Sequence, residues 1–203
     1  MPASPLRERQ ASLARTAIFE ALVHHLESGD ADDIAMEDLA QEAGVSRRTL
    51  YRYFPTRSAL LAEAAEWIRD ELLQLPVEIG DEGIAGSFRK AASRLSHRPE
   101  LARALLRSTT GRMLRSGYRS ARVEAIRLAL RREVPGLGRR DIDRAAPILS
   151  YLCSSNAWIS IQDESGLDTR HAQAAVEWAI EALLAQLRDG ATPTPANRKK
   201  GGT

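Results

Sequence analysis

The amino-acid sequence predicts an all-α fold of about nine helices. Apolar residues recur every three or four positions through most of the 203 residues, the spacing of one face of an amphipathic helix. Glycine and proline interrupt this pattern at intervals, and the alternation of apolar and polar residues that is typical of strands is essentially absent from the sequence. The composition, 43% hydrophobic and 28% charged, is that of a folded globular protein rather than a disordered chain.

Breaks in the periodic pattern set the expected helix boundaries. The nine helices are expected at residues 6–26, 36–43, 46–54, 58–75, 84–96, 99–108, 112–133, 141–163 and 168–189. Glycine or proline ends each of the first four, at Gly29, Gly44, Pro55 and Pro76. Ser46 is a suitable N-cap for the third helix, because its hydroxyl can accept a hydrogen bond from an otherwise unpaired backbone N–H. Residues 190–203 have no apolar face, and they predict a disordered tail.

Several classes of protein are excluded at this stage. The single cysteine, Cys153, rules out an intramolecular disulfide, and the four histidines form no cluster at metal-ligand spacing. We therefore expect neither a metal nor a cofactor. The sequence lacks the long apolar run of a membrane span and the apolar core of a secretory signal, so a cytoplasmic protein without a membrane partner is expected.

The most informative stretch lies between Ile34 and Leu61. Two short helices joined by a turn with a glycine are typical of a helix-turn-helix, whose second helix enters the major groove of DNA. Leu39 and Leu50, with Val45, are expected to form its core. The outer part of the second helix then carries six polar side chains: Arg47, Arg48, Thr49, Tyr51, Arg52 and Tyr53. Arginine can hold guanine with two hydrogen bonds, and Tyr and Thr hydroxyls reach phosphates.

The residues around this motif resemble the tetracycline-repressor (TetR) family of bacterial transcriptional regulators. The resemblance rests on five short stretches at the family's spacing: Leu39-Ala40, Ala43-Gly44-Val45-Ser46, Thr49-Leu50-Tyr51, Tyr53-Phe54 and Ser58-Ala59-Leu60-Leu61. It implies that Arg47, Arg48 and Thr49 read bases, that Tyr51 and Tyr53 contact bases or backbone, and that Arg57 holds a phosphate. One departure is Ala35, where members often have a Ser or Thr that caps the second helix.

The resemblance also implies a division of the chain. Residues 1–57 would bind DNA, residues 58–189 would bind a ligand and dimerise, and residues 190–203 would form the tail. The expected function is a ligand-responsive regulator, a repressor that binds a palindromic operator in double-stranded DNA as a homodimer and is released by a small-molecule inducer. The alternative is a ligand-independent or architectural DNA-binding protein. The third class, a helical enzyme, lacks any recognisable catalytic constellation or phosphate loop in the sequence.

Two apolar stripes suggest where the homodimer would form. One lies in the expected helix 141–163 and one in the expected helix 168–189, and their members are Ile148, Leu149, Leu152 and Ile159, then Val176, Ala179, Ile180, Leu183, Leu184 and Leu187. Pairing both helices across a twofold axis would give a four-helix interface. The inducer pocket is expected among the helices between Ser58 and Ile161, lined by Trp67, Met113, Tyr118, Asn156 and Trp158.

Positive charge is concentrated in residues 85–140. This segment contains fifteen Lys and Arg and three Asp and Glu, a net charge of +12, whereas the whole chain carries only +2. On one continuous helix 112–133, Arg112, Arg115, Arg119 and Arg122 would share a face. Three interpretations are open: a solvated face paired with the acidic residues of 58–84, a site for an anionic inducer, or an additional DNA contact.

Overall fold

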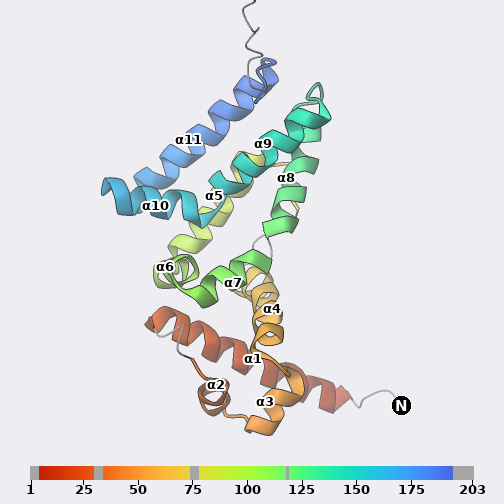
Figure 1. The fold of residues 1–203 in the computed structure, drawn as a ribbon, viewed down its shortest axis with the longest axis vertical. Helices are drawn as coiled ribbons and strands as arrows, with labels where there is room; N and C mark the ends of the chain where they lie inside the picture. The colour runs from red at the N-terminus through yellow and green to blue at the C-terminus, as the bar shows by residue number, and fades with distance from the viewer. Residues whose placement is uncertain (1–4, 30–33, 74–77, 118, 194–203) are drawn as a thin grey trace, which may run out of the picture. The chain divides into compact units, whose positions relative to one another are not determined.

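The computed structural model describes residues 5–29, 34–73, 78–117 and 119–193. Within these residues every regular element is helical, which confirms the all-α fold class (Figure 1). None of these helices combines the length and the apolar character needed to cross a lipid bilayer. The expected tail lies largely outside the described residues, because the description ends at Pro193.

The chain divides into two compact units that are not contiguous in sequence. Unit 1 comprises Met1–Pro76 and Ala91–Ser120, and unit 2 comprises Val77–Lys90 and Ala121–Thr203. The helix α5 (Gly83–Ser96) contributes its first half to unit 2 and its second half to unit 1. Each unit has its own core of buried apolar residues.

Unit 1 contains the predicted helix-turn-helix and the helices that hold it. Its elements are α1 (Pro5–Ser28), α2 (Met36–Glu42), α3 (Arg47–Tyr53), α4 (Arg57–Trp67), a π-helical turn η1 (Ile68–Leu72), α6 (Pro99–Arg107) and α7 (Thr109–Gly117). Helix α1 packs on both α2 and α6, and α7 packs on both α4 and α6. The core includes Leu22 of α1 and Leu60 of α4, each at most 1% exposed. The predicted end of the fourth helix, near Leu75, falls outside the described residues.

Unit 2 contains α8 (Arg119–Glu133), most of which lies in this unit, α9 (Arg139–Leu152), α10 (Ser155–Ser165) and α11 (Thr169–Arg188). Helix α10 packs on α9 and α11. Leu149, Trp158 and Ile180 are at most 3% exposed and belong to its core. The half-buried Cys153 follows α9, and burial raises the pKa of its thiol to about 12. The group is thus a neutral thiol at physiological pH.

One of the nine expected helices, at residues 141–163, is wrong, because it corresponds to two helices, α9 and α10. The expected helix 141–163 breaks after α9, at Cys153 and Ser154. Ser154 has an extended backbone (ψ 154°), and its hydroxyl donates to the carbonyl of Tyr151 at 2.6 Å. Serine side chains compete in this way with the backbone for hydrogen bonds. The apolar residues keep the helical spacing on both sides of this break, so the sequence pattern does not reveal it.

The expected helix 112–133 includes residue 118, which lies outside the described residues. The structure has α7 and α8 on either side of residue 118, and they fall largely in different units. The four arginines expected to share a face are divided between these two helices. Arg115 donates to the carbonyl of Leu105 within unit 1, whereas Arg122 donates to the hydroxyl of Ser150 within unit 2. These two side chains hold neighbouring helices of their own units.

A carboxylate ties three helices of unit 2 together at the start of α5. Glu133, the last residue of α8, accepts a hydrogen bond from the backbone N–H of Ile84 at 2.9 Å and one from Arg188 of α11 at 3.2 Å. Its side chain is only 18% exposed. The N–H groups of a first helical turn have no partner within the helix, so Glu133 acts as a cap from another helix.

Replacing Glu133 by Ala is expected to destabilise the protein by about 1 to 2 kcal/mol, because it removes a charged acceptor from the partly buried N–H of Ile84 and from the exposed Arg188. Urea unfolding followed by circular dichroism measures the change. Glu124→Ala is the matched control, since Glu124 is an exposed residue of the same helix with an ion pair to Arg127 one turn away. Equal unfolding midpoints for the two variants would contradict the capping role.

Candidate DNA-binding surface

Local hydrogen bonds start the recognition helix α3 and set the turn before it. Gly44 has a φ of +65°, which a side chain would strain, and the N–H of Val45 donates to the carbonyl of Ala40 at 2.9 Å. Ser46 is the N-cap of α3, as predicted. Its hydroxyl oxygen accepts from the N–H of Thr49 at 3.1 Å and lies 2.9 Å from the Thr49 hydroxyl. The two helices therefore meet at a fixed turn.

Burial of Leu50 and Phe54 decides which side of α3 faces outward. Both are 0% exposed, which confirms the predicted core position of Leu50, and the Phe54 ring lies 5.5 Å from the ring of Phe19 on α1. Leu39 of α2 is also buried, at 1%, whereas Val45 is half-buried. This small core attaches α2 and α3 to α1.

The structure brings six of the seven predicted DNA contacts to the outer part of α3. Four of them are exposed, and Thr49 and Tyr53 are half-buried; the exposed ones are Arg47, Arg48, Tyr51 and Arg52. Three of these four are arginines. The N-terminal part of the helix thus presents positive charge together with hydroxyl groups, which is the combination that phosphates and base edges bind.

An acidic residue that the sequence reasoning missed lies among these cations. Glu37, in the first turn of α2, forms an ion pair with Arg47 at 2.7 Å and accepts a hydrogen bond from the Tyr51 hydroxyl at 3.4 Å. The Arg47 guanidinium also lies 5.7 Å from the centre of the Tyr51 ring. From sequence, Glu37 is simply an acid favoured by the helix dipole. Only the approach of α2 to α3 shows that it holds two of the predicted contacts.

Arg57 differs from the other six predicted contacts. It is half-buried at the start of α4 and donates to the backbone carbonyl of Ile34 and, at 2.8 Å, to the hydroxyl of Thr110 on α7. Its guanidinium is therefore engaged inside unit 1. The helix α2 that follows Ile34 has no side-chain cap, as expected from Ala35.

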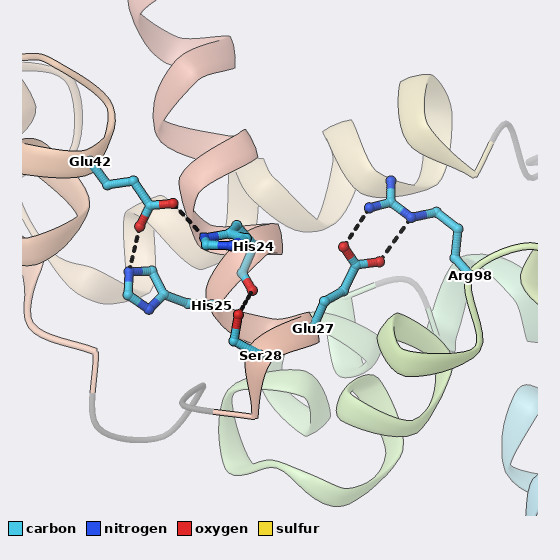
Figure 2. A network of polar contacts seen from close by, with 6 residues as sticks. All are labelled: His24, His25, Glu27, Ser28, Glu42 and Arg98. Carbon is cyan, nitrogen blue, oxygen red and sulfur yellow. Dashed lines mark hydrogen bonds and ion pairs between the residues drawn. The ribbon is translucent and has the colours of Figure 1, made fainter.

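Two further polar clusters attach the C-terminal end of α1 to its surroundings (Figure 2). His24 and His25, although adjacent, reach the two oxygens of the Glu42 carboxylate at the end of α2, at 2.6 and 2.8 Å. Arg98, the residue before α6, donates two hydrogen bonds to the Glu27 carboxylate, at 2.9 and 2.6 Å. Helix α1 is thus connected to the helix-turn-helix on one side and to α6 on the other.

The five residues expected to line an inducer pocket are distributed over both units. Trp67 and Met113 belong to unit 1, where Trp67 packs 5.6 Å from the Phe19 ring and Met113 is 44% exposed. Trp158 and Asn156 belong to unit 2, and the Asn156 amide donates to the Tyr151 hydroxyl at 2.9 Å. Tyr118 lies outside the described residues.

The helix-turn-helix region matches a known protein family and relatives from bacteria. Residues 18–64 match the family model of bacterial regulatory proteins of the tetR family. The nucleoid occlusion factor SlmA of Vibrio vulnificus is 39% identical over 69 residues, which are 34% of this chain and 35% of that protein. SlmA of Photorhabdus laumondii is 38% identical over 60 residues, 29% and 30% of the two chains. The matched stretch thus spans about a third of the length of these relatives.

Solved structures match over most of the chain. A TetR-family transcriptional regulator from Rhodococcus sp. superposes with a TM-score of 0.63 at 20% identity, over 85% of this chain and 99% of that one. A second transcriptional regulator, from Rhodococcus sp. Rha1, gives a TM-score of 0.61 at 22% identity, over 89% and 99% of the two chains. At this identity the likeness establishes the fold.

Replacing Ser46 by Ala is expected to destabilise the protein by about 1 kcal/mol, because the N–H of Thr49 loses its side-chain acceptor at the start of α3. Urea unfolding monitors the loss. Ser58→Ala serves as the control, since Ser58 is an exposed residue of α4, whose N-cap is Thr56. The capping role of Ser46 is refuted if both alanine variants unfold at the wild-type midpoint.

Proposed function

We propose that this chain, whose residues 18–64 match the tetR family of bacterial regulatory proteins, is a transcriptional repressor. It binds a palindromic DNA operator as a homodimer through its helix-turn-helix and is released by a small molecule. The observation that carries the proposal is the outward face of α3, where Arg47, Arg48 and Arg52 are exposed beside Tyr51.

We assign base contacts to the first turn of α3. Arg47 and Arg48 are its first two residues, where a recognition helix approaches base edges, and a bidentate arginine–guanine pair discriminates against a wrong base by about 1 to 3 kcal/mol. Thr49 is assigned to the same group. Tyr51, Arg52 and Tyr53 come later in the helix and are assigned to bases or phosphates. The Arg52 guanidinium donates to the Tyr53 hydroxyl at 3.1 Å, which orders both side chains.

Unit 2 offers a surface for the proposed homodimer. An apolar groove of about 160 Å³ runs along α9 and α11, and its lining includes Ala145, Ile148, Leu149, Leu183, Gln186 and Leu187. Ile148 is 50% exposed and Leu183 37%, and Leu152 and Ala179 are half-buried. The remaining members of the two predicted stripes are buried inside the unit. A self-complementary apolar face of this kind suits a twofold interface, and two recognition helices then meet two half-sites.

Release by a small molecule completes the proposal. The match to the tetR family supports it, as does the second helical unit, which DNA binding alone does not require. The alternative, a ligand-independent or architectural DNA-binding protein, uses the same surface of α3. The SlmA relatives are nucleoid occlusion factors, but the stretch they share with this chain is about a third of their length. It supports DNA binding and no further activity.

Selection of bound duplexes from a random DNA pool tests the DNA-binding proposal. Wild-type protein is expected to enrich a palindromic sequence, and an Arg48→Ala, Tyr53→Ala double variant is expected to lose this enrichment because both side chains belong to the outer part of α3. Arg131→Ala, which removes an exposed charge from α8, is the control and should enrich the same palindrome. Equal enrichment by the double variant would contradict the assigned contacts.

Leu183→Asp is expected to convert the dimer to a monomer, because it places a charge in the apolar groove between α9 and α11. Light scattering coupled to size-exclusion chromatography reports the mass. Leu128→Asp is the matched control, since Leu128 is 50% exposed on α8 of the same unit and does not line the groove. A dimeric Leu183→Asp variant would place the interface elsewhere.

A further inference from the structure

Arg57 joins three helices of unit 1 at one point. It is the first residue of α4, and its guanidinium donates to the carbonyl of Ile34, just before α2, and to the hydroxyl of Thr110 on α7. All three residues belong to unit 1. The distances along the chain, 23 residues to Ile34 and 53 to Thr110, show that this contact connects segments which are far apart in sequence.

The groups that Arg57 binds are buried and need partners. Ile34 is 5% exposed and precedes the N-cap of α2, and the helical hydrogen bonds of α2 begin only with the carbonyl of Ala35, which accepts from Leu39. Thr110 is 2% exposed. A buried carbonyl without a hydrogen bond is costly, and a guanidinium can serve two acceptors at once because its N–H donors form a planar fork.

The Arg57 contact fixes the start of α2, which has no side-chain N-cap. Ala35 gives α2 no side-chain cap, so the Arg57 guanidinium holds the backbone directly before the helix instead. The turn at Gly44 then transmits the position of α2 to α3. On the other side of the guanidinium, Thr110 lies on α7, which packs closely on α6: a Cβ at Gly111 would come within 2.4 Å of the Ala104 carbonyl oxygen. Arg57 is thus hydrogen-bonded to a residue of a tightly packed pair of helices.

We propose that Arg57 is a positioning residue of the DNA-binding surface, which fixes the start of α2, and through α2 the recognition helix, to Thr110 of α7. This inference rests on the proposed DNA-binding function. It assigns Arg57 a different role from the phosphate contact that the family resemblance implies, because both of its described hydrogen bonds go to groups inside unit 1.

Four substitutions, together with Arg57→Gln in the salt-dependence test below, separate the two roles. Thr110→Val removes the hydroxyl and keeps the shape, and Thr110→Ser keeps the hydroxyl. Arg57→Lys keeps the charge but replaces the planar fork by a compact ammonium group. Thr109→Val is the matched control, because Thr109 is the neighbouring residue on α7, is exposed, and accepts a hydrogen bond from Arg112 of its own helix.

The first readout needs no DNA. Hydrogen exchange in the free protein is expected to speed up in the amides of α2 in Thr110→Val and Arg57→Lys, and to stay at the wild-type rate in α1. Thr110→Ser and Thr109→Val should exchange like the wild type. A merely structural role would raise exchange across all of unit 1. Wild-type exchange of α2 in both Thr110→Val and Arg57→Lys would overturn the proposal.

The second readout is affinity for the selected operator over a range of salt concentrations. Thr110→Val and Arg57→Lys are expected to bind roughly tenfold more weakly, because each removes a partner from a buried charged hydrogen bond, with an unchanged dependence on salt. A phosphate contact predicts the opposite: both variants bind like the wild type, and Arg57→Gln lowers the slope of log affinity against log salt by about 0.9. That result would overturn the positioning role.

The two readouts keep the two proposals apart. If the wild type enriches no DNA sequence, the proposed function fails, and hydrogen exchange still decides whether Arg57 holds α2. If the wild type binds its operator and Thr110→Val binds it equally well, DNA binding stands and the positioning role fails.

Discussion

The burial of two side chains, Leu50 and Phe54, governs what the recognition helix presents to its surroundings. They are four residues apart, so they lie on one side of α3, and both are fully buried against the rest of unit 1. Turning α3 about its axis would expose them, at a cost of about 1.5 to 3 kcal/mol each. The arginines at positions 47, 48 and 52 therefore face outward as a consequence of packing.

Most of the fold could be predicted from sequence because glycine, proline and N-cap residues mark the ends of its helices. Gly44 and Ser46 define the turn and the start of α3, and Asp168 caps α11 by accepting from the N–H of His171. The break between α9 and α10 could not be predicted in the same way. Ser154 lies in an apolar pattern that continues with the right period on both sides, although the helix ends there, with the Ser154 hydroxyl donating to the carbonyl of Tyr151.

The candidate site was predictable where it depends on one helix and unpredictable where it depends on contacts between helices. The outward face of α3 follows from the positions of Leu50 and Phe54. The pairing of Glu37 with Arg47 depends on the approach of α2 to α3, and the position of Arg57 depends on α7, which comes 53 residues later in the chain. No local sequence pattern predicts such contacts between helices, because they depend on the packing of unit 1 as a whole.

The discontinuous course of the chain has a consequence for anyone who builds chimeric regulators. Unit 1 is assembled from Met1–Pro76 and Ala91–Ser120, and the second segment supplies both Arg98, the partner of Glu27, and Thr110, the partner of Arg57. A chimera that contains only Met1–Pro76 of unit 1 would lack the partners of Glu27 on α1 and of Arg57 on α4. The part of this protein to transfer is therefore two separate segments, and sequence from the other protein would replace Val77–Lys90 and Ala121–Thr203.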